Sequence, residues 1–212
     1  MSDAPEADSK GPAKPPPLKP ATVLDSIFRD DGPMPPARFG IRLLAFVMDA
    51  VLALGVSMVI LKFSLVANYP DAFELLDAHF QASQDLNYAF EIARNPEQMD
   101  PALMDVLSYI FTVIIMTFWF YFAVIEALLG GTTLGKRTCR LKTISTINLS
   151  NPTIFSSMVR GGLKTAGFFF FGIFGWAAIL IPLFLNKRRQ MGHDMLSRTV
   201  VVDERKMAEQ QP

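Results

Sequence analysis

The sequence predicts an all-α integral membrane protein with about three apolar helical segments, and three observations support this class. Half of the 212 residues are hydrophobic and only 19% are charged, which is more apolar than a typical soluble domain. The apolar residues are concentrated in three long runs rather than spread along the chain. The first run, residues 43–61, contains a single charge and is long enough to cross a bilayer as a helix.

Residues 1–37 precede the first apolar run and contain nine of the fifteen prolines. Such a composition cannot bury a core, so we predict a disordered Pro-rich tail. This segment lacks the basic patch, apolar core and small-residue cleavage site of a secretory signal. The first apolar segment is therefore expected to direct membrane insertion itself.

A membrane domain is predicted over residues 38–203, followed by a polar tail at 204–212. The second apolar run, residues 106–125, carries no charge, and the third is interrupted by several glycines and by Pro182. The predicted spans are about 39–65, 106–129 and 163–185.

The loops between these spans differ sharply in charge. Residues 68–105 hold eight acidic residues and one arginine, whereas residues 130–162 hold five basic residues and no acidic one. Because basic loops stay in the cytoplasm, we expect the N-terminus and the 130–162 loop inside, and the acidic loop outside. The apolar spacing in the acidic loop favours two short amphipathic helices, with a disordered loop as the alternative.

The side of the C-terminus is ambiguous. Three full crossings place it outside, yet the basic residues at 187–189 favour inside. Residues 140–144 and 198–202 read as short strands, and their pairing requires both on the cytoplasmic side. Two alternatives remain: the third apolar segment is a re-entrant hairpin broken near Gly172–Gly175, or it is a plain third crossing.

Asp49 is the charge inside the first apolar run. Arg42 lies seven residues earlier on roughly the same helical face, and Glu126 ends the second run near the same inner boundary. All three can meet between the first two helices on the cytoplasmic side. One interpretation is a site for a proton or a cation, with Arg42 tuning the carboxylates. The other is a buried ion pair that fixes helix packing.

The segment 130–137, GGTTLGKR, is close to a phosphate-binding P-loop. It has arginine where the motif needs serine or threonine, and it follows a membrane helix rather than a strand, so nucleotide hydrolysis is rejected. We predict a glycine turn that contains Gly135, with Lys136 and Arg137 facing lipid phosphates or the nearby carboxylates.

His193 and Asp194 can relay protons, or Asp194 can cap a helix or pair with neighbouring basic residues. We assign Asp194, together with Arg42, Asp49 and Glu126, to one candidate ion-binding or buried charge network. No catalytic triad and no metal-ligand spacing is present, so neither an enzyme nor a cofactor is predicted. The single cysteine, Cys139, excludes an internal disulfide, and the net charge of zero gives no reason to expect nucleic acid as a partner.

Four pieces in order resemble the RDD family of small bacterial membrane proteins: Arg42-Leu-Leu-Ala-Phe-Val-Met-Asp49, Glu126, the glycine turn with Gly135, and His193-Asp194 with the Val201–Val202 strand. The resemblance covers about residues 38–203. By position, the arginine and two aspartates of the family name match Arg42, Asp49 and Asp194. Ser197–Arg198 departs from the small residues that many members carry there.

The resemblance implies a membrane protein with about three spans, and some members are associated with sodium/proton exchange. We therefore hold two hypotheses for this multi-pass protein of the bacterial inner membrane. In the first, it transports a monovalent cation or proton through Asp49 and Glu126 as a homo-oligomer. In the second, it is a scaffold or an assembly or stress factor that binds other membrane proteins and whose buried charges are structural.

Overall fold

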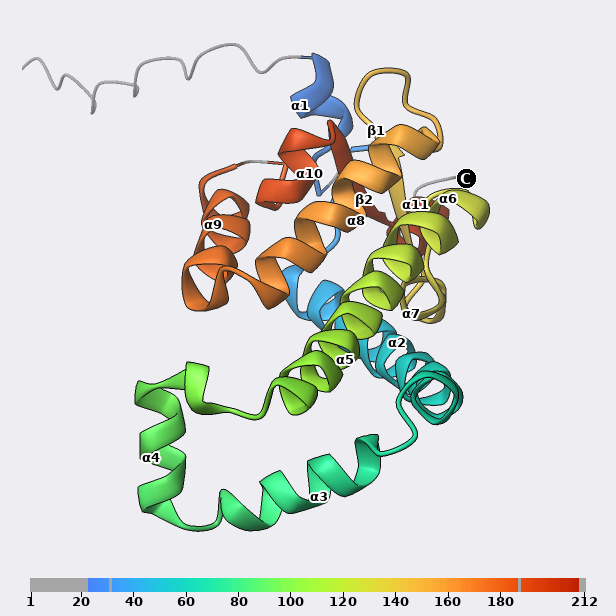
Figure 1. Ribbon diagram of the computed structural model, residues 1–212. Coiled ribbons are helices and arrows are strands. Elements are labelled where there is room, and N and C mark those ends of the chain that lie inside the picture. Colours follow the sequence, from blue (N-terminus) through green and yellow to red (C-terminus); the bar gives the residue numbers. More distant parts are fainter. Residues whose placement is uncertain (1–22, 31, 187, 210–212) are drawn as a thin grey trace, which may run out of the picture.

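A computed structural model describes residues 23–30, 32–186 and 188–209 (Figure 1). The N-terminal part of the predicted tail, residues 1–22, and Lys187 lie outside the described residues. The elements in chain order are α1 (Val23–Ile27), α2 (Phe39–Asn68), α3 (Ala72–Ala82), α4 (Leu86–Arg94), the 3-10 turn η1 (Pro96–Gln98), α5 (Pro101–Phe120), the π-helical turn η2 (Tyr121–Ile125), α6 (Glu126–Leu128), α7 (Leu134–Thr138), β1 (Leu141–Ser145), α8 (Ile154–Phe169), α9 (Gly172–Leu185), α10 (Gly192–Leu196), β2 (Thr199–Asp203) and α11 (Glu204–Glu209).

Within the described residues, two helices are long and apolar enough to cross a membrane. They are α2, with 30 residues, and the continuous helix Pro101–Leu128, with 28 residues, which contains α5, η2 and α6. At 1.5 Å per residue they are about 45 and 42 Å long. Val51, Val59 and Phe63 of α2 are each more than half exposed. Apolar surface on this scale is typical of a helix that contacts lipid.

The buried face of α2 turns toward α5 and α7. Its buried residues recur at intervals of three or four residues, which is the spacing of one helical face. Ala53 and Ser57 lie in the middle of that face and are small, so α5 can approach closely. Asp49 lies on the same face one turn earlier and is therefore turned into the protein rather than into lipid.

The third apolar segment is a helical hairpin. α8 begins at Ile154, nine residues before the predicted start, and α9 runs back along it. With 16 and 14 residues, each arm is only about 24 or 21 Å long. The chain bends at Gly172, which has a φ of +47° that glycine adopts readily. α10 then packs against α8 and β2, so the chain returns to the end of the molecule where β1 lies.

The sheet joins distant parts of the sequence. β1 and β2 are antiparallel, with Leu141 opposite Asp203 and Ser145 opposite Thr199. The segment before α2 lies along the other edge of β2, because the Ala37 N–H donates to the Val201 carbonyl at 2.9 Å. This additional segment stabilises the two-stranded sheet, which alone would be only marginally stable.

The predicted tail is therefore shorter than residues 1–37. Residues 23–37 form α1 and the segment beside β2, and the Phe28 side chain is only 1% exposed. Phe28 packs against Ile144, Val200 and Val202. Burial of this aromatic side chain offsets the conformational entropy that is lost when the segment becomes ordered. The prediction from the proline-rich composition gave too much weight to that entropy.

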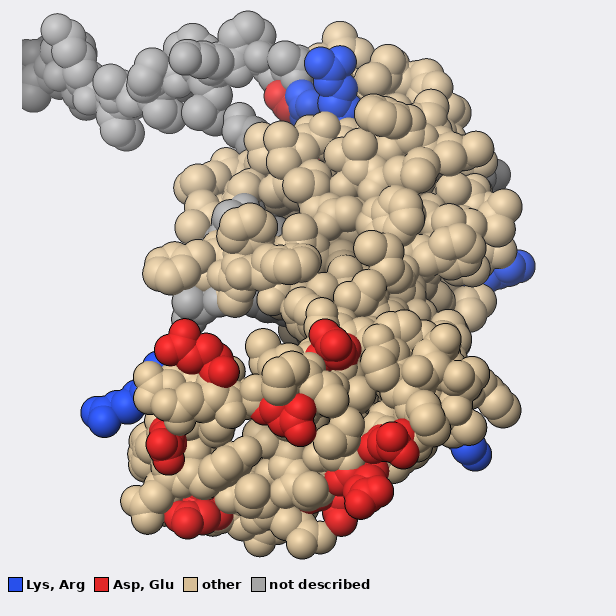
Figure 2. All heavy atoms as spheres, in the orientation of Figure 1, with Lys and Arg blue, Asp and Glu red and all other residues tan. Residues whose placement is uncertain are grey.

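The acidic loop forms an arm at the opposite end of the long helices from the sheet. It contains α3 and α4, which extend away from the body (Figure 1). Acidic side chains gather over this arm, and a broad band without acidic or basic side chains separates it from the sheet end in the same view (Figure 2).

Candidate functional site

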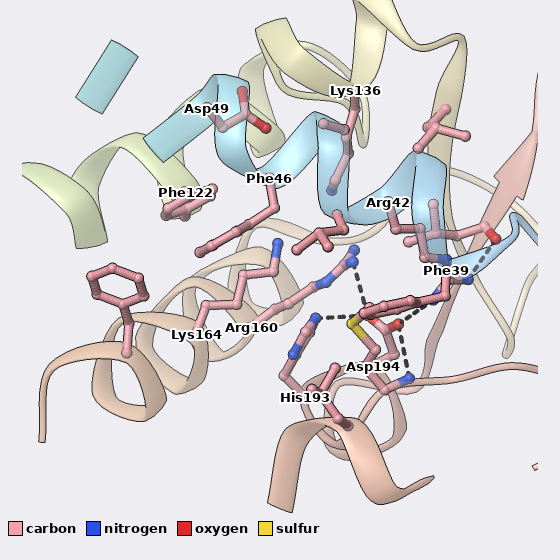
Figure 3. Close-up of a pocket in the computed structure, with 17 residues that line it drawn as sticks. Phe39, Arg42, Phe46, Asp49, Phe122, Lys136, Arg160, Lys164, His193 and Asp194 are labelled. Atoms are coloured by element: carbon pink, nitrogen blue, oxygen red, sulfur yellow. Dashed lines mark hydrogen bonds and ion pairs between the residues drawn. The ribbon is translucent and has the colours of Figure 1, made fainter. Parts of the chain in front are cut away.

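A cavity of about 80 Å³ lies between α2, α8 and α10 near the sheet end of the long helices (Figure 3). This volume is enough for several water molecules. Phenylalanine side chains from α2, η2 and α8 form much of its apolar lining, together with aliphatic residues such as Leu43 and Leu141. The charged or titratable lining residues are Arg42, Asp49, Lys136, Arg160, Lys164, His193 and Asp194.

Asp49 is held by neutral hydrogen-bond donors. Its carboxylate accepts from the Tyr121 hydroxyl at 2.7 Å, the Thr133 hydroxyl at 2.5 Å and the Gly135 backbone N–H at 2.7 Å. Among the described residues, no lysine, arginine or histidine forms an ion pair with Asp49. The side chain is only 1% exposed, so this carboxylate is buried without a cationic partner.

The glycine turn reaches Asp49 because Gly135 has no side chain. A Cβ atom at Gly135 would lie 2.3 Å from the Ala45 carbonyl oxygen and 2.9 Å from the Asp49 carboxylate. Thr133 caps α7 by accepting from the Lys136 N–H at 3.4 Å. The predicted turn therefore places Lys136 inside the protein, whereas Arg137 is exposed.

Arg42 pairs with Asp194 and not with Asp49. Its guanidinium donates to the Asp194 carboxylate at 3.2 Å, and to the backbone carbonyls of Arg189 at 2.9 Å and Val201 at 2.8 Å. The expected juxtaposition with Asp49 fails for a geometric reason. Seven residues correspond to about 10 Å along a helix, and both side chains lean toward the N-terminus, so Arg42 is directed away from Asp49.

Arg160 of α8 connects the two remaining acids. It forms an ion pair with Glu126 at 2.6 Å and another with Asp194 at 2.8 Å. Asp194 also lies 3.2 Å from His193 Nε2 and accepts from the Met191 N–H at 3.2 Å. The result is a continuous chain of contacts from Arg42 on α2 through Asp194 and Arg160 to Glu126.

Glu126 faces three cations. Besides Arg160, it contacts Lys136 at 2.9 Å and Lys164 at 3.6 Å. Thr143 of β1 accepts from both Lys136 and Arg160, which fixes these side chains beside Glu126. Lys164 also lies over the ring of Phe122, 5.1 Å from its centroid.

The cluster is richer in basic than in acidic groups. Four cations (Arg42, Lys136, Arg160, Lys164) face three carboxylates (Asp49, Glu126, Asp194), which leaves one positive charge in excess with His193 neutral. Burial lowers the pKa of His193 to about 4, so its ring is neutral near pH 7. Burial alone raises the pKa of Asp194, but the positive charges of Arg160 and Arg42 hold it well below its usual range.

Sequence reasoning placed Arg42, Asp49, Glu126 and Asp194 in one network. The structure joins three of them through Arg160 and places Asp49 on the same cavity with different partners. The sequence analysis missed Arg160 and Lys164, which lie four residues apart on one face of α8. The sequence did contain a signal for them. It showed three acidic residues near apolar runs and a single arginine to pair with them, so more basic partners were needed.

Among the residues that the structure describes, no group of three His, Cys, Asp or Glu side chains is placed to hold a metal ion. A model of the RDD family matches residues 36–198 of the chain. The chain belongs to the RDD family. With its long apolar helices, it is an integral membrane protein. Of the three residues that match the family name by position, Arg42 and Asp194 form a direct pair, while Asp49 accepts hydrogen bonds from Thr133 and Gly135 of the glycine turn. Neither a curated protein nor a solved structure matches the chain.

Proposed function

We propose that this RDD protein is a multi-pass protein of the bacterial inner membrane with the sheet end in the cytoplasm. The basic 130–162 segment contains β1, and the basic residues Arg188 and Arg189 precede β2. The acidic arm lies at the other end of the long helices. The positive-inside rule therefore assigns the same orientation to all three segments.

We further propose that the protein moves protons across this membrane, with Asp49 as the carboxylate that binds them. The observation that carries this proposal is that Asp49 is buried on the cavity wall without a cationic partner, whereas Glu126 and Asp194 are both paired with cations. A purely structural carboxylate gains most from a basic partner. An ionisable group left without one inside a membrane span is by default a candidate for function.

A proton fits this geometry better than sodium or another monovalent cation. Two of the three groups that donate to Asp49 are hydroxyls, from Tyr121 and Thr133, which can rotate and accept a hydrogen bond when the carboxyl is protonated. A metal cation needs a shell of several oxygens and would also face the positive excess of the neighbouring cluster. Two crossings and a hairpin rarely enclose a complete path, so we propose a homo-oligomer.

The test is proton flux into liposomes that contain the purified full-length protein and an internal pH dye, driven by a potassium diffusion potential. We expect an acidification that Asp49→Asn abolishes. Asp105→Asn, which changes an exposed acid on α5, is the matched control and should leave the flux unchanged. Pulses of sodium, lithium or choline distinguish an exchanger from a proton conductor. The absence of any dye response from well-inserted protein would refute proton transport and cation exchange together.

The ion-pair chain favours the second hypothesis, in which the protein is a non-transporting scaffold. The chain of contacts ties α2, α8 and α10 together, which is what a rigid platform needs. Under this hypothesis Asp49→Asn lowers the amount of folded protein in the membrane, and proton flux is absent from the unmodified protein as well. Immunoblots of membrane fractions beside the flux assay separate the two hypotheses.

A further inference from the structure

The cavity opens onto the lipid-facing surface. Leu43 of α2 and Phe168 of α8 both line it, and they are 40% and 37% exposed. The opening therefore lies between two helices that present apolar side chains outward. Arg42 is three residues after the start of α2, about 4.5 Å along the helix, which corresponds to the headgroup level of a bilayer.

The inner wall of the cavity has hydrogen-bond donors without acceptors. Among the described residues, the Arg42 Nε and Arg160 Nε atoms are buried and have no hydrogen-bond partner. Two carboxylate oxygens, Asp194 Oδ1 and Glu126 Oε2, also lack a hydrogen bond, but each has a cation within ion-pair distance, Arg160 at 2.8 Å and Lys164 at 3.6 Å. The ammonium of Lys164 is 3.6 Å from Glu126, which is an ion-pair contact but too long for a hydrogen bond. Donors of this kind indicate an acceptor that the protein itself does not supply.

The carboxylates that line the cavity repel an anion less strongly than their number suggests. Asp49 already accepts three hydrogen bonds, and Asp194 is paired with Arg42 and Arg160. The positive charge in excess is one, which matches the single negative charge of a phosphodiester. Arginine and lysine side chains are the usual protein partners of phosphate oxygens.

From the opening, the unpartnered donors and the charge excess together, we propose that this cavity binds the phosphodiester group of an anionic phospholipid. One acyl chain leaves between Leu43 and Phe168 and continues along the outer apolar surface. Lys164, Arg160 and Arg42 contact the phosphate oxygens. A headgroup with its own ammonium group adds a positive charge where one is already in excess, so it is disfavoured. This site does not depend on proton movement through Asp49.

Native mass spectrometry of the full-length, delipidated protein in detergent tests the proposal. Phosphatidylglycerol, phosphatidylcholine and inorganic phosphate are the probes. We expect phosphatidylglycerol to bind at least about tenfold more tightly than phosphatidylcholine, and Lys164→Met to remove most of that preference. Lys62→Met is the matched control, because Lys62 is an exposed lysine of α2 outside the cavity lining. It should leave the preference for phosphatidylglycerol unchanged.

Leu43→Trp is a second variant that narrows the opening from an exposed position and leaves the charges intact. This variant should weaken the binding of phosphatidylglycerol at least about fivefold if the acyl chain leaves the cavity at this opening. Equal binding of both lipids in every variant overturns the proposal. Inorganic phosphate that binds as tightly as phosphatidylglycerol, with dependence on Lys164 and none on Leu43, overturns the assignment to a lipid.

Discussion

Replacing Glu126 with glutamine removes one negative charge and leaves the shape of the side chain almost unchanged. In the native protein this carboxylate contacts Arg160 at 2.6 Å, Lys136 at 2.9 Å and Lys164 at 3.6 Å. The substitution leaves three buried cations around a neutral amide. Breaking a buried ion pair by removing one partner costs about 3–5 kcal/mol.

The cost falls in the lower part of that range because Lys136 can lose its proton. Burial, with Arg160 in the same direction, already lowers the pKa of Lys136 well below its ordinary value. We expect a loss of about 3 kcal/mol, which corresponds to a fall in Tm of about 6–12 °C for a chain of this size.

Thermal unfolding of the full-length protein in detergent, followed by tryptophan fluorescence, measures this loss. Glu97→Gln, which changes an exposed acid of the acidic arm, is the control and should leave Tm unchanged. The double variant Glu126→Gln with Lys136→Met should recover part of the loss, because it removes one of the unpaired cations. A fall of less than about 2 °C in Glu126→Gln would refute the reasoning that these charges are mutually dependent.

Three further predictions concern the neighbouring contacts. Gly135→Ala should destabilise the protein by about 1–3 kcal/mol in the same unfolding assay, because its Cβ would lie 2.9 Å from the Asp49 carboxylate and α7 must move away. The pKa of His193 is lowered to about 4, so between pH 6.5 and pH 4 the unfolded chain binds a proton at this residue and the native protein does not. The free energy of unfolding should therefore be highest above pH 6.5 and should decline by about 3 kcal/mol as the pH falls to 4. A pH series of Tm measures this decline, and His193→Gln should remove it. Arg42→Lys should cost about 2–3 kcal/mol, because the native hydrogen bonds come from two guanidinium nitrogens and the single ammonium nitrogen of lysine cannot take both positions. A double-mutant cycle with Asp194→Asn should then give a coupling energy of at least about 1 kcal/mol.

The membrane-spanning character and the family were readable from the sequence, because long apolar runs and the RDD pattern are local signals. The first two spans are helices at nearly the predicted positions. The partners of the buried charges were harder to predict. Arg42 and Asp194 are 152 residues apart, and helical periodicity gives no information about contacts at that separation. The nearer candidate, Asp49, was favoured only by its spacing.

The π-helical turn is another feature that periodicity does not reveal. η2 inserts extra backbone before Glu126, which changes the rotation of the helix by about 100° for each added residue. An ideal α-helix would therefore direct Glu126 elsewhere. Gly161 packs against Ala123 of this turn, where a Cβ would lie 2.8 Å from the Ala123 backbone nitrogen. Arg160 precedes that glycine, and close packing here brings it to Glu126.

The pairing of Arg42 with Asp194 also has a consequence for biosynthesis. A ribosome makes the first span long before it makes residue 194, so the guanidinium enters the membrane region before its carboxylate exists. Arg42 must meanwhile stay at the aqueous boundary, where water can solvate it. The N-terminal segment beside β2 likewise lacks its hydrogen-bond partners until this last part of the chain has been made. A nascent protein cut short before β2 would thus carry an exposed charge and an unpaired backbone edge, and both features would mark it as unfinished to the proteases of the membrane.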